Sequence, residues 1–182
     1  SYGDSPYQSF SARAGNPNFI DFAELIEAGY LEQRDIDGVY LGSDPSIVDY
    51  GAIFGGRRQI LDRAAERFAA DKPADFDDFI QANEDWLIPY CEFMTVKEEC
   101  GLKAFWEWPA ELRTRGEASA KVCADHPARM LYHQMTQYFF DRQWSRLKAY
   151  ANERDILIIG DLPIYVSRDS VEMWATPELF KI

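Results

Sequence analysis

A single aspartate near the end of the chain, Asp161, has the type and setting to do chemistry. It follows Gly160 and the apolar run of residues 156–159, and Pro163 imposes a turn directly after it. A continuous run of mostly β-branched apolar residues is typical of a parallel strand that is covered on both faces. We therefore expect a carboxylate at the end of a buried strand, in the mouth of a sheet or barrel. The alternative is a plain turn residue at a strand end.

Aromatic and acidic residues between positions 105 and 125 form a second set of candidates. Phe105-Trp106-Glu107-Trp108-Pro109 could stack on the apolar faces of sugars, or its rings could pack within a helical layer. Glu107, Glu111 and Asp125 qualify as catalytic acids by type alone. No motif surrounds them, so we expect these carboxylates to lie on a solvated face.

The cysteines argue against a metal centre. Cys91, Cys100 and Cys123 form no Cys-x-x-Cys pair, and only His126 and His133 could join them. This pattern predicts free thiols in the reducing cytoplasm and no metal site.

Charge and hydropathy narrow the class of partner. The 182 residues include 19 basic and 31 acidic side chains, giving a net charge of −12 with the basic residues scattered. Such a pattern does not predict a surface that binds the phosphates of nucleic acid, and we expect a partner without net charge. No apolar run approaches the roughly 20 residues of a membrane span, and no signal peptide is visible. Both ends look cut, which predicts a piece of a larger protein.

The patterns along the chain divide it into three regions. Residues 1–56 are mostly ordered loop, with a short helix that starts near Asp21 and is closed by Gly29. Residues 57–127 are mainly helical, and Pro89 should bend or end the helix that starts near Asp75. Residues 128–182 should form a long helix to about residue 154, followed by the strand that carries the Gly-Asp-Leu-Pro motif.

Several strings of residues resemble a known family over essentially the whole chain. The family is that of the 4-α-glucanotransferases called amylomaltases or disproportionating enzymes, glycoside hydrolase family 77 of the α-amylase clan. The strings are Tyr2-Gly3-Asp4-Ser5-Pro6-Tyr7-Gln8-Ser9-Phe10-Ser11-Ala12 with Gly15-Asn16-Pro17, Val48-Asp49-Tyr50, Gln143-Trp144, Gly160-Asp161-Leu162-Pro163-Ile164-Tyr165-Val166, and Asp169-Ser170 with Trp174.

The resemblance implies an α/β fold, the N-terminal portion of a (β/α)₈ TIM barrel with a helical insertion, incomplete in this chain. It also implies transfer of α-1,4-glucan segments from a donor to an acceptor glucan or glucose, by a retaining double displacement. Such a transferase serves glycogen, starch or maltodextrin metabolism, binds maltooligosaccharides and needs no cofactor. A non-catalytic α-glucan-binding fragment and a hydrolase of the same clan are the alternatives.

The resemblance also assigns roles to single residues. It places Asp161, Tyr7 and Ser5 against the bound sugar. Independently of the resemblance, Tyr2 and Tyr50 lie in loop strings rich in Gly, Pro and Asp, and they either form a second glucan-contact surface or simply anchor the loops. The family's nucleophile aspartate and acid/base glutamate lie in motifs that are not found here, so we expect them C-terminal to Ile182 and expect the isolated fragment to be inactive.

Two residues depart from the family's pattern. Arg13 replaces an aromatic residue, and Arg168 follows Ser167 where Ala-His or Ala-Glu is common.

Overall fold

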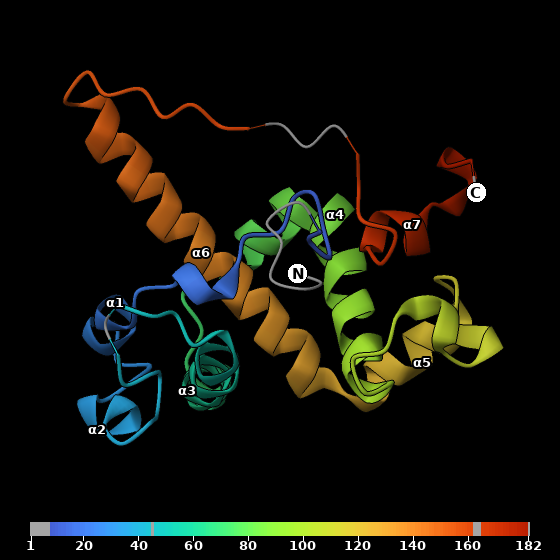
Figure 1. Ribbon diagram of the computed structural model, residues 1–182, viewed down its shortest axis with the longest axis horizontal. Coiled ribbons are helices and arrows are strands. Elements are labelled where there is room, and N and C mark those ends of the chain that lie inside the picture. Colours follow the sequence, from blue (N-terminus) through green and yellow to red (C-terminus); the bar gives the residue numbers. More distant parts are fainter. Residues whose placement is uncertain (1–7, 45, 162–164, 182) are drawn as a thin grey trace.

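The computed structural model describes residues 8–44, 46–161 and 165–181, and these residues form helices and connecting loops without a strand (Figure 1). No helix in the described part of the chain is long and apolar enough to cross a membrane. The α-helices are α1 (Phe22–Glu27), α2 (Gln33–Ile36), α3 (Tyr50–Ala70), α4 (Phe76–Glu99), α5 (Glu117–Asp125), α6 (Pro127–Asn152) and α7 (Val171–Ala175), with short 3₁₀ turns at Pro17–Phe19, Phe105–Glu107, Ala110–Leu112 and Pro177–Leu179.

The short helix α1 has the ends that the sequence predicts. The Asp21 carboxylate accepts a hydrogen bond of 2.9 Å from the Ala23 amide, which would otherwise lack a partner at the helix N-terminus. Beyond the last turn, Gly29 adopts a positive φ of 82°, a conformation that glycine tolerates best. The predicted helix start near Asp21 and its glycine cap are confirmed.

The core lies where α3 and α4 pack against the long helix α6, which crosses the molecule diagonally in Figure 1. Its centre is aromatic. Phe68 of α3 meets Phe76 of α4 edge to face, with ring centroids 4.9 Å apart, and it also contacts Tyr138 and Phe139 of α6. Edge-to-face packing places the positive edge of one ring against the negative face of another, and it also buries both rings. The expected long helix after residue 127 is confirmed.

Helix α4 continues past Pro89 to Glu99, so the proline does not end it early. The ribbon changes direction along α4 in Figure 1, as expected for a helix that loses one amide donor at a proline. Its C-terminal half joins a second core, where Phe93 packs against Trp108 and Trp174. Because Trp108 is buried there, its ring belongs to the packing of the helical layer and is not a sugar-stacking surface.

The buried strand expected at residues 156–159 is not present among the described residues. The segment is irregular after α6, and the side chains of Leu157 and Ile159 are 82% and 93% exposed. A parallel strand needs neighbouring strands for its backbone groups and a layer on each face. The described residues provide no such neighbour, so the apolar pattern has nothing to pair with here.

Candidate functional site

The residues assigned to sugar binding lie on separate elements. Asp161 is exposed, in the irregular segment that runs from the end of α6 back toward α7 in Figure 1. Tyr50 is the first residue of α3 and is 57% exposed. Tyr2, Ser5 and Tyr7 lie outside the described residues, so the expected grouping of Tyr7 with Asp161 stays a prediction.

The structure does bring together two of the strings that carry the resemblance, the N-terminal string and the one that begins at Asp169. The Val171 amide donates a hydrogen bond of 2.9 Å to the Phe10 carbonyl. Next to it, Glu172 Oε1 accepts a bond of 2.7 Å from the Ala12 amide and one of 3.2 Å from the Ser11 hydroxyl. Segments about 160 residues apart therefore share one junction, which we call the string junction: residues 10–12 with residues 169–172.

The N-terminal string is also fixed to α6 on its other side. Gln137 exchanges two hydrogen bonds with Gly15, accepting from its amide at 2.8 Å and donating to its carbonyl at 3.0 Å. A Cβ at Gly15 would lie 2.1 Å from the Phe140 ring, so only glycine allows this approach. Arg13, one of the departures from the family pattern, makes an exposed ion pair of 2.6 Å with Asp85 of α4.

A buried ion pair lies at the string junction. Lys97 Nζ of α4 is 2.6 Å from Asp169 Oδ2, and the two side chains are 1% and 6% exposed. Lys97 also donates to the Lys103 carbonyl at 2.9 Å, and Asp169 Oδ1 accepts from the Phe105 amide at 3.2 Å. Buried charges require partners of this kind, because an unpaired ion loses its hydration without compensation.

The second departure from the family pattern makes a surface contact close to this pair. The Arg168 guanidinium lies over the ring of Trp106, 4.5 Å from its centroid, as in a cation–π interaction. Trp106 is partly exposed, unlike Trp108. Because Arg168 covers one face of Trp106, that face is not free to stack on a sugar.

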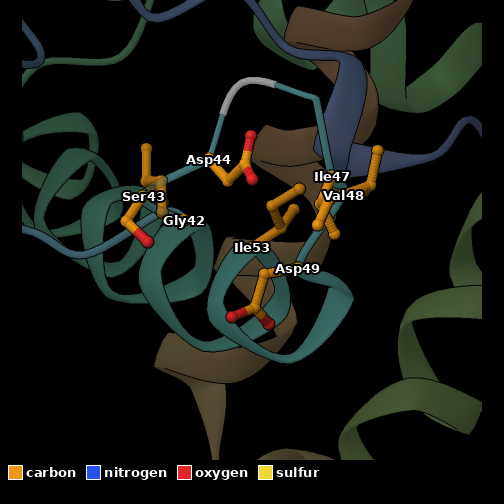
Figure 2. A pocket seen from close by; sticks show the side chains of 8 residues that line it. Gly42, Ser43, Asp44, Ile47, Val48, Asp49 and Ile53 are labelled. Atoms are coloured by element: carbon orange, nitrogen blue, oxygen red, sulfur yellow. The ribbon is translucent and has the colours of Figure 1, made fainter.

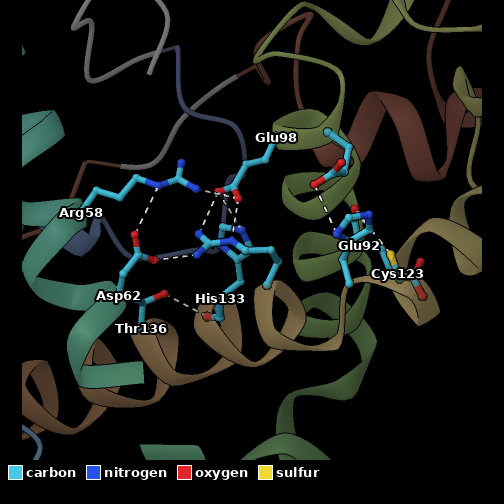
Figure 3. Close-up of polar contacts among 10 residues, drawn as sticks. Arg58, Asp62, Glu92, Glu98, Cys123, His133 and Thr136 are labelled. Atoms are coloured by element: carbon cyan, nitrogen blue, oxygen red, sulfur yellow. Dashed lines mark hydrogen bonds and ion pairs between the residues drawn. The ribbon is translucent and has the colours of Figure 1, made fainter. Parts of the chain in front are cut away.

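A second group of buried charges lies where α3, α4 and α6 meet (Figure 3). Glu98 of α4 forms an ion pair of 2.7 Å with Arg58 of α3 and accepts a hydrogen bond of 2.8 Å from Arg129 of α6. Arg129 also donates to Asp62 at 2.6 Å. His133 Nε2 lies 3.1 Å from Glu98 Oε1 but is not aligned for a hydrogen bond. We call these five residues the Glu98 cluster.

The charge states in the Glu98 cluster follow from burial and from the arginines. Burial lowers the pKa of His133 and outweighs the attraction of Glu98, so the imidazole is neutral at pH 7. Burial alone would raise the pKa of Glu98, yet contacts with His133 and Arg129 hold it at about 2. Among the arginines, Arg129 contributes to this lowering through its hydrogen bond and its positive charge.

A cavity of about 370 Å³ lies beside the N-terminus of α3 (Figure 2). The Asp49 carboxylate caps the helix by accepting from the Ala52 amide at 2.9 Å. Asp44 accepts from the hydroxyl and the amide of Ser46, and these bonds lower the pKa of Asp44. Tyr50 directly follows the lining residue Asp49. The lining residues are Leu41, Gly42, Ser43, Asp44, Ile47, Val48, Asp49 and Ile53.

The cysteines are not arranged for metal binding. Cys91, Cys100 and Cys123 are free thiols, and burial raises the pKa of Cys123 to about 11. Across the ranges that the structure describes, no three His, Cys, Asp or Glu residues are grouped so that they could hold a metal ion.

Comparison with known proteins identifies the class to which this helical block and its joined strings belong. A family model described as 4-alpha-glucanotransferase matches residues 1–182, and the chain therefore belongs to the 4-α-glucanotransferase family. The resemblance carried by the sequence strings is confirmed.

Individual relatives agree with this assignment. The 4-alpha-glucanotransferase of Streptococcus pneumoniae serotype 4 is 50% identical over 184 residues, covering 100% of this chain and 36% of its own length. That of Thermus thermophilus is 39% identical over 186 residues, with the same coverage of both chains. The chain thus spans about a third of the length of these curated relatives.

A solved structure has the same fold over this chain. The amylomaltase from Streptococcus agalactiae, in complex with acarbose, superposes with a TM-score of 0.92 at 47% identity. The match covers 100% of this chain and 37% of the amylomaltase. The described helices are therefore an amylomaltase-like fold over that part of its length.

Proposed function

We propose that the protein carrying this chain is a 4-α-glucanotransferase that moves α-1,4-glucan segments from a donor to an acceptor glucan or glucose. The observation that carries the proposal is the family match over all 182 residues, and two of the strings that carry the resemblance meet at the string junction. The amylomaltase from Streptococcus agalactiae was solved with acarbose, which supports α-glucans as the ligands. Glycogen, starch or maltodextrin metabolism in the cytoplasm is the setting we propose.

The proposed chemistry is a retaining double displacement. A nucleophile carboxylate attacks the anomeric carbon of the donor, an acid protonates the leaving glucan, and a covalent glycosyl-enzyme forms. The 4-hydroxyl of the acceptor then gives its proton to the same acid/base group and displaces the nucleophile. On the basis of the family resemblance, we propose that both carboxylates lie C-terminal to Ile182 in the whole protein. Within this chain, Asp161, Tyr7 and Ser5 are assigned to holding the sugar near the cleavage point.

We propose further that residues 156–160 become a strand of a (β/α)₈ barrel in the whole protein. Their β-branched apolar pattern and the exposure of Leu157 and Ile159 support this, because both would gain neighbours from a closed barrel. In the same proposal residues 1–56 supply barrel loops and an early strand region, residues 57–127 are mainly the helical insertion, and residues 128–182 supply a barrel helix and the strand that carries the Gly-Asp-Leu-Pro motif.

Incubation of the full-length protein with maltotriose tests the transferase against its alternatives. Transfer converts two maltotriose molecules into glucose and maltopentaose, whereas hydrolysis consumes water and gives glucose and maltose. A non-catalytic glucan-binding protein leaves the substrate unchanged. Accumulation of maltose and glucose without longer products would replace the transferase by a hydrolase of the same clan.

We also propose a second glucan-contact surface that includes Tyr50, with Tyr2 as a second contributor; Tyr50 does not line the cavity beside α3 but directly follows its lining residue Asp49. Tyr50 offers an exposed ring for an apolar sugar face and a hydroxyl for a sugar hydroxyl. A remote contact helps only a glucan long enough to reach it, so Tyr50→Ala and Tyr2→Ala should raise KM on amylose and leave maltotriose kinetics unchanged. Equal losses on both substrates, or a lower melting temperature alone, would assign these tyrosines to loop anchoring.

A further inference from the structure

The segment that carries Asp161 is anchored at its two ends. Upstream, the Ile156 amide donates to the Ala151 carbonyl at 3.0 Å and closes the end of α6. Downstream, Asp169 and Ser170 are buried again. The described residues between these ends are largely exposed. Within the described residues, the hydrogen bonds that hold this segment are those at its two ends.

The downstream anchor is built on one cation. The Lys97 ammonium pairs with Asp169 and donates to the Lys103 carbonyl. The rings of Phe10, Phe93 and Trp108 surround it, with centroids 4.7, 5.5 and 6.0 Å from Nζ, so three aromatic faces take the place of water.

The same cation also fixes the N-terminal string. Phe10 contacts Lys97 through its ring, while its carbonyl accepts from the Val171 amide two residues after Asp169. Removing the charge would leave the Asp169 carboxylate buried, with the Phe105 amide as its only donor among the described residues. A carboxylate in that state regains water by moving outward, and residues 169–171 must move with it.

We propose that Lys97 is a positioning residue for the glucan site: its buried pair with Asp169 fixes both the downstream end of the Asp161 segment and the string around Phe10. The inference rests on the proposed transferase function, because it concerns the placement of Asp161 against the bound sugar. Lys97 acts through Asp169 and touches no substrate.

The next residue of the same helix provides a matched control. Glu98 is also buried and ion-paired, but its partners Arg58 and Arg129 belong to α3 and α6, away from the string junction. Glu98→Gln should therefore destabilise the protein as Lys97→Met does, without releasing residues 169–172.

The test compares kcat and KM for maltotriose in the full-length wild type, Lys97→Met and Glu98→Gln. Assays are run at a temperature where circular dichroism shows all three to be folded. A misplaced group of about 1 Å can cost about 10²-fold in rate, so we expect Lys97→Met to lower kcat by about 10-fold or more, with a smaller effect on KM. Glu98→Gln should stay within about two-fold of wild type, as expected for a change that leaves the site geometry intact. Equal kcat values for the two variants would overturn the proposal.

A second variant keeps the test decisive if Lys97→Met does not fold. Asp169→Asn preserves the side-chain shape and an oxygen acceptor for the Phe105 amide while it weakens the pair with Lys97. Its kcat should fall between those of Lys97→Met and wild type. A wild-type kcat in a folded Asp169→Asn protein would also overturn the proposal.

Hydrogen exchange separates this inference from the proposed function. In whichever of these variants folds, loss of the ion pair should speed exchange of the Ala12 and Val171 amides, which bond across the string junction. Glu98→Gln should leave both amides protected. Unchanged exchange after loss of the pair would overturn the anchor itself. If the wild type does not disproportionate maltotriose, the proposed function fails, and the exchange data alone still decide whether Lys97 is the anchor.

Discussion

Asp161 lies on a motif string and is exposed, and among the described residues it forms no ion pair of the kind that Asp169 or Glu98 forms. Asp49 also lies exposed on a motif string, but its carboxylate caps helix α3. A structural carboxylate is normally paired, whereas one that accepts hydrogen bonds from a sugar must be open to it. The residue-scale evidence thus agrees with a binding role for Asp161.

Replacement of Asp161 by Asn in the full-length protein should depress turnover more than it weakens ground-state binding. A carboxylate near the reacting sugar acts mainly where positive charge develops, and removal of one such preorganised group costs on the order of 10²-fold in kcat. The measurement is kcat and KM on maltotriose. Asp155→Asn, in the turn before the same segment, is the matched control and should remain near wild type. A near-normal turnover of Asp161→Asn would make Asp161 a plain turn residue.

At the scale of the elements, helix α3 begins seven residues before the position expected from the sequence. Helical spacing is evident only from about Arg57, whereas α3 starts at Tyr50. Gly51, Gly55 and Gly56 lie in its first turns, and glycine has a poor helix propensity. The Asp49 cap and packing of the preceding loop stabilise these turns, and neither is visible as a periodic pattern.

Two neighbouring glycines of α3 should respond to alanine in opposite ways. A Cβ at Gly56 would lie 2.7 Å from Leu41 Cδ2 and from the Tyr40 carbonyl oxygen, while a Cβ at Gly55 would meet nothing within 4 Å. Gly55→Ala should raise stability by about 0.5–1 kcal/mol through helix propensity, and Gly56→Ala should lower it by about 1–3 kcal/mol through overpacking. Urea midpoints of both variants check this. Stabilisation by Gly56→Ala would contradict this and would show that the loop at residues 39–41 moves away from the added Cβ at little cost in free energy.

The Glu98 cluster joins α3, α4 and α6 and makes stability depend on pH. The pKa of Glu98 is about 2 in the folded protein against an ordinary 4.5, so its contribution is fully present above about pH 4.5 and is lost as pH falls toward 2. The difference corresponds to about 3 kcal/mol. The stability gap between wild type and Glu98→Gln should therefore narrow as pH falls from about 7 to about 3.

Urea unfolding of both proteins across that range measures the gap. His133 also titrates there: its lowered pKa means that protonation favours the unfolded state as pH falls below about 6.5. Glu98 raises the pKa of His133, so Glu98→Gln lowers that pKa further and the His133 contribution differs between the two proteins. The narrowing is therefore read below about pH 4.5, where Glu98 itself titrates. A gap that stays constant over that range would show that Glu98 is not held ionised by its partners.

At the scale of the whole molecule, short-range sequence patterns predicted the positions of helices and their ends, but they did not predict contacts between residues far apart in the sequence. The Asp21 cap, the glycine closing α1 and the long helix after residue 127 follow from short-range patterns. The Lys97–Asp169 pair joins residues 72 positions apart, and no short-range rule connects them. The only sequence signal was a lysine among apolar neighbours on α4, Phe93 and Val96, which identifies a buried charge without naming its partner.

The family strings, in contrast, indicated the correct family over the entire chain, yet the strand they imply is absent from the described residues. This difference is physical: strand pairing is a property of the neighbours as much as of the segment itself. The apolar run at residues 156–159 can therefore be strand-like in pattern and irregular in this chain.

Ile159→Ser, made both in residues 1–182 alone and in the full-length protein, tests whether the rest of the protein buries residues 156–159. Ile159 is almost fully exposed here, so Ile159→Ser in residues 1–182 alone should change stability by less than about 0.5 kcal/mol. In the full-length protein the proposed barrel would bury Ile159, and the same change should cost about 2–4 kcal/mol, since it removes a buried side chain and places a hydroxyl among apolar groups. Unfolding followed by circular dichroism gives both values. Because each context serves as the control for the other, a small effect in both would mean that Ile159 stays at the surface and that residues 156–160 are not an interior barrel strand.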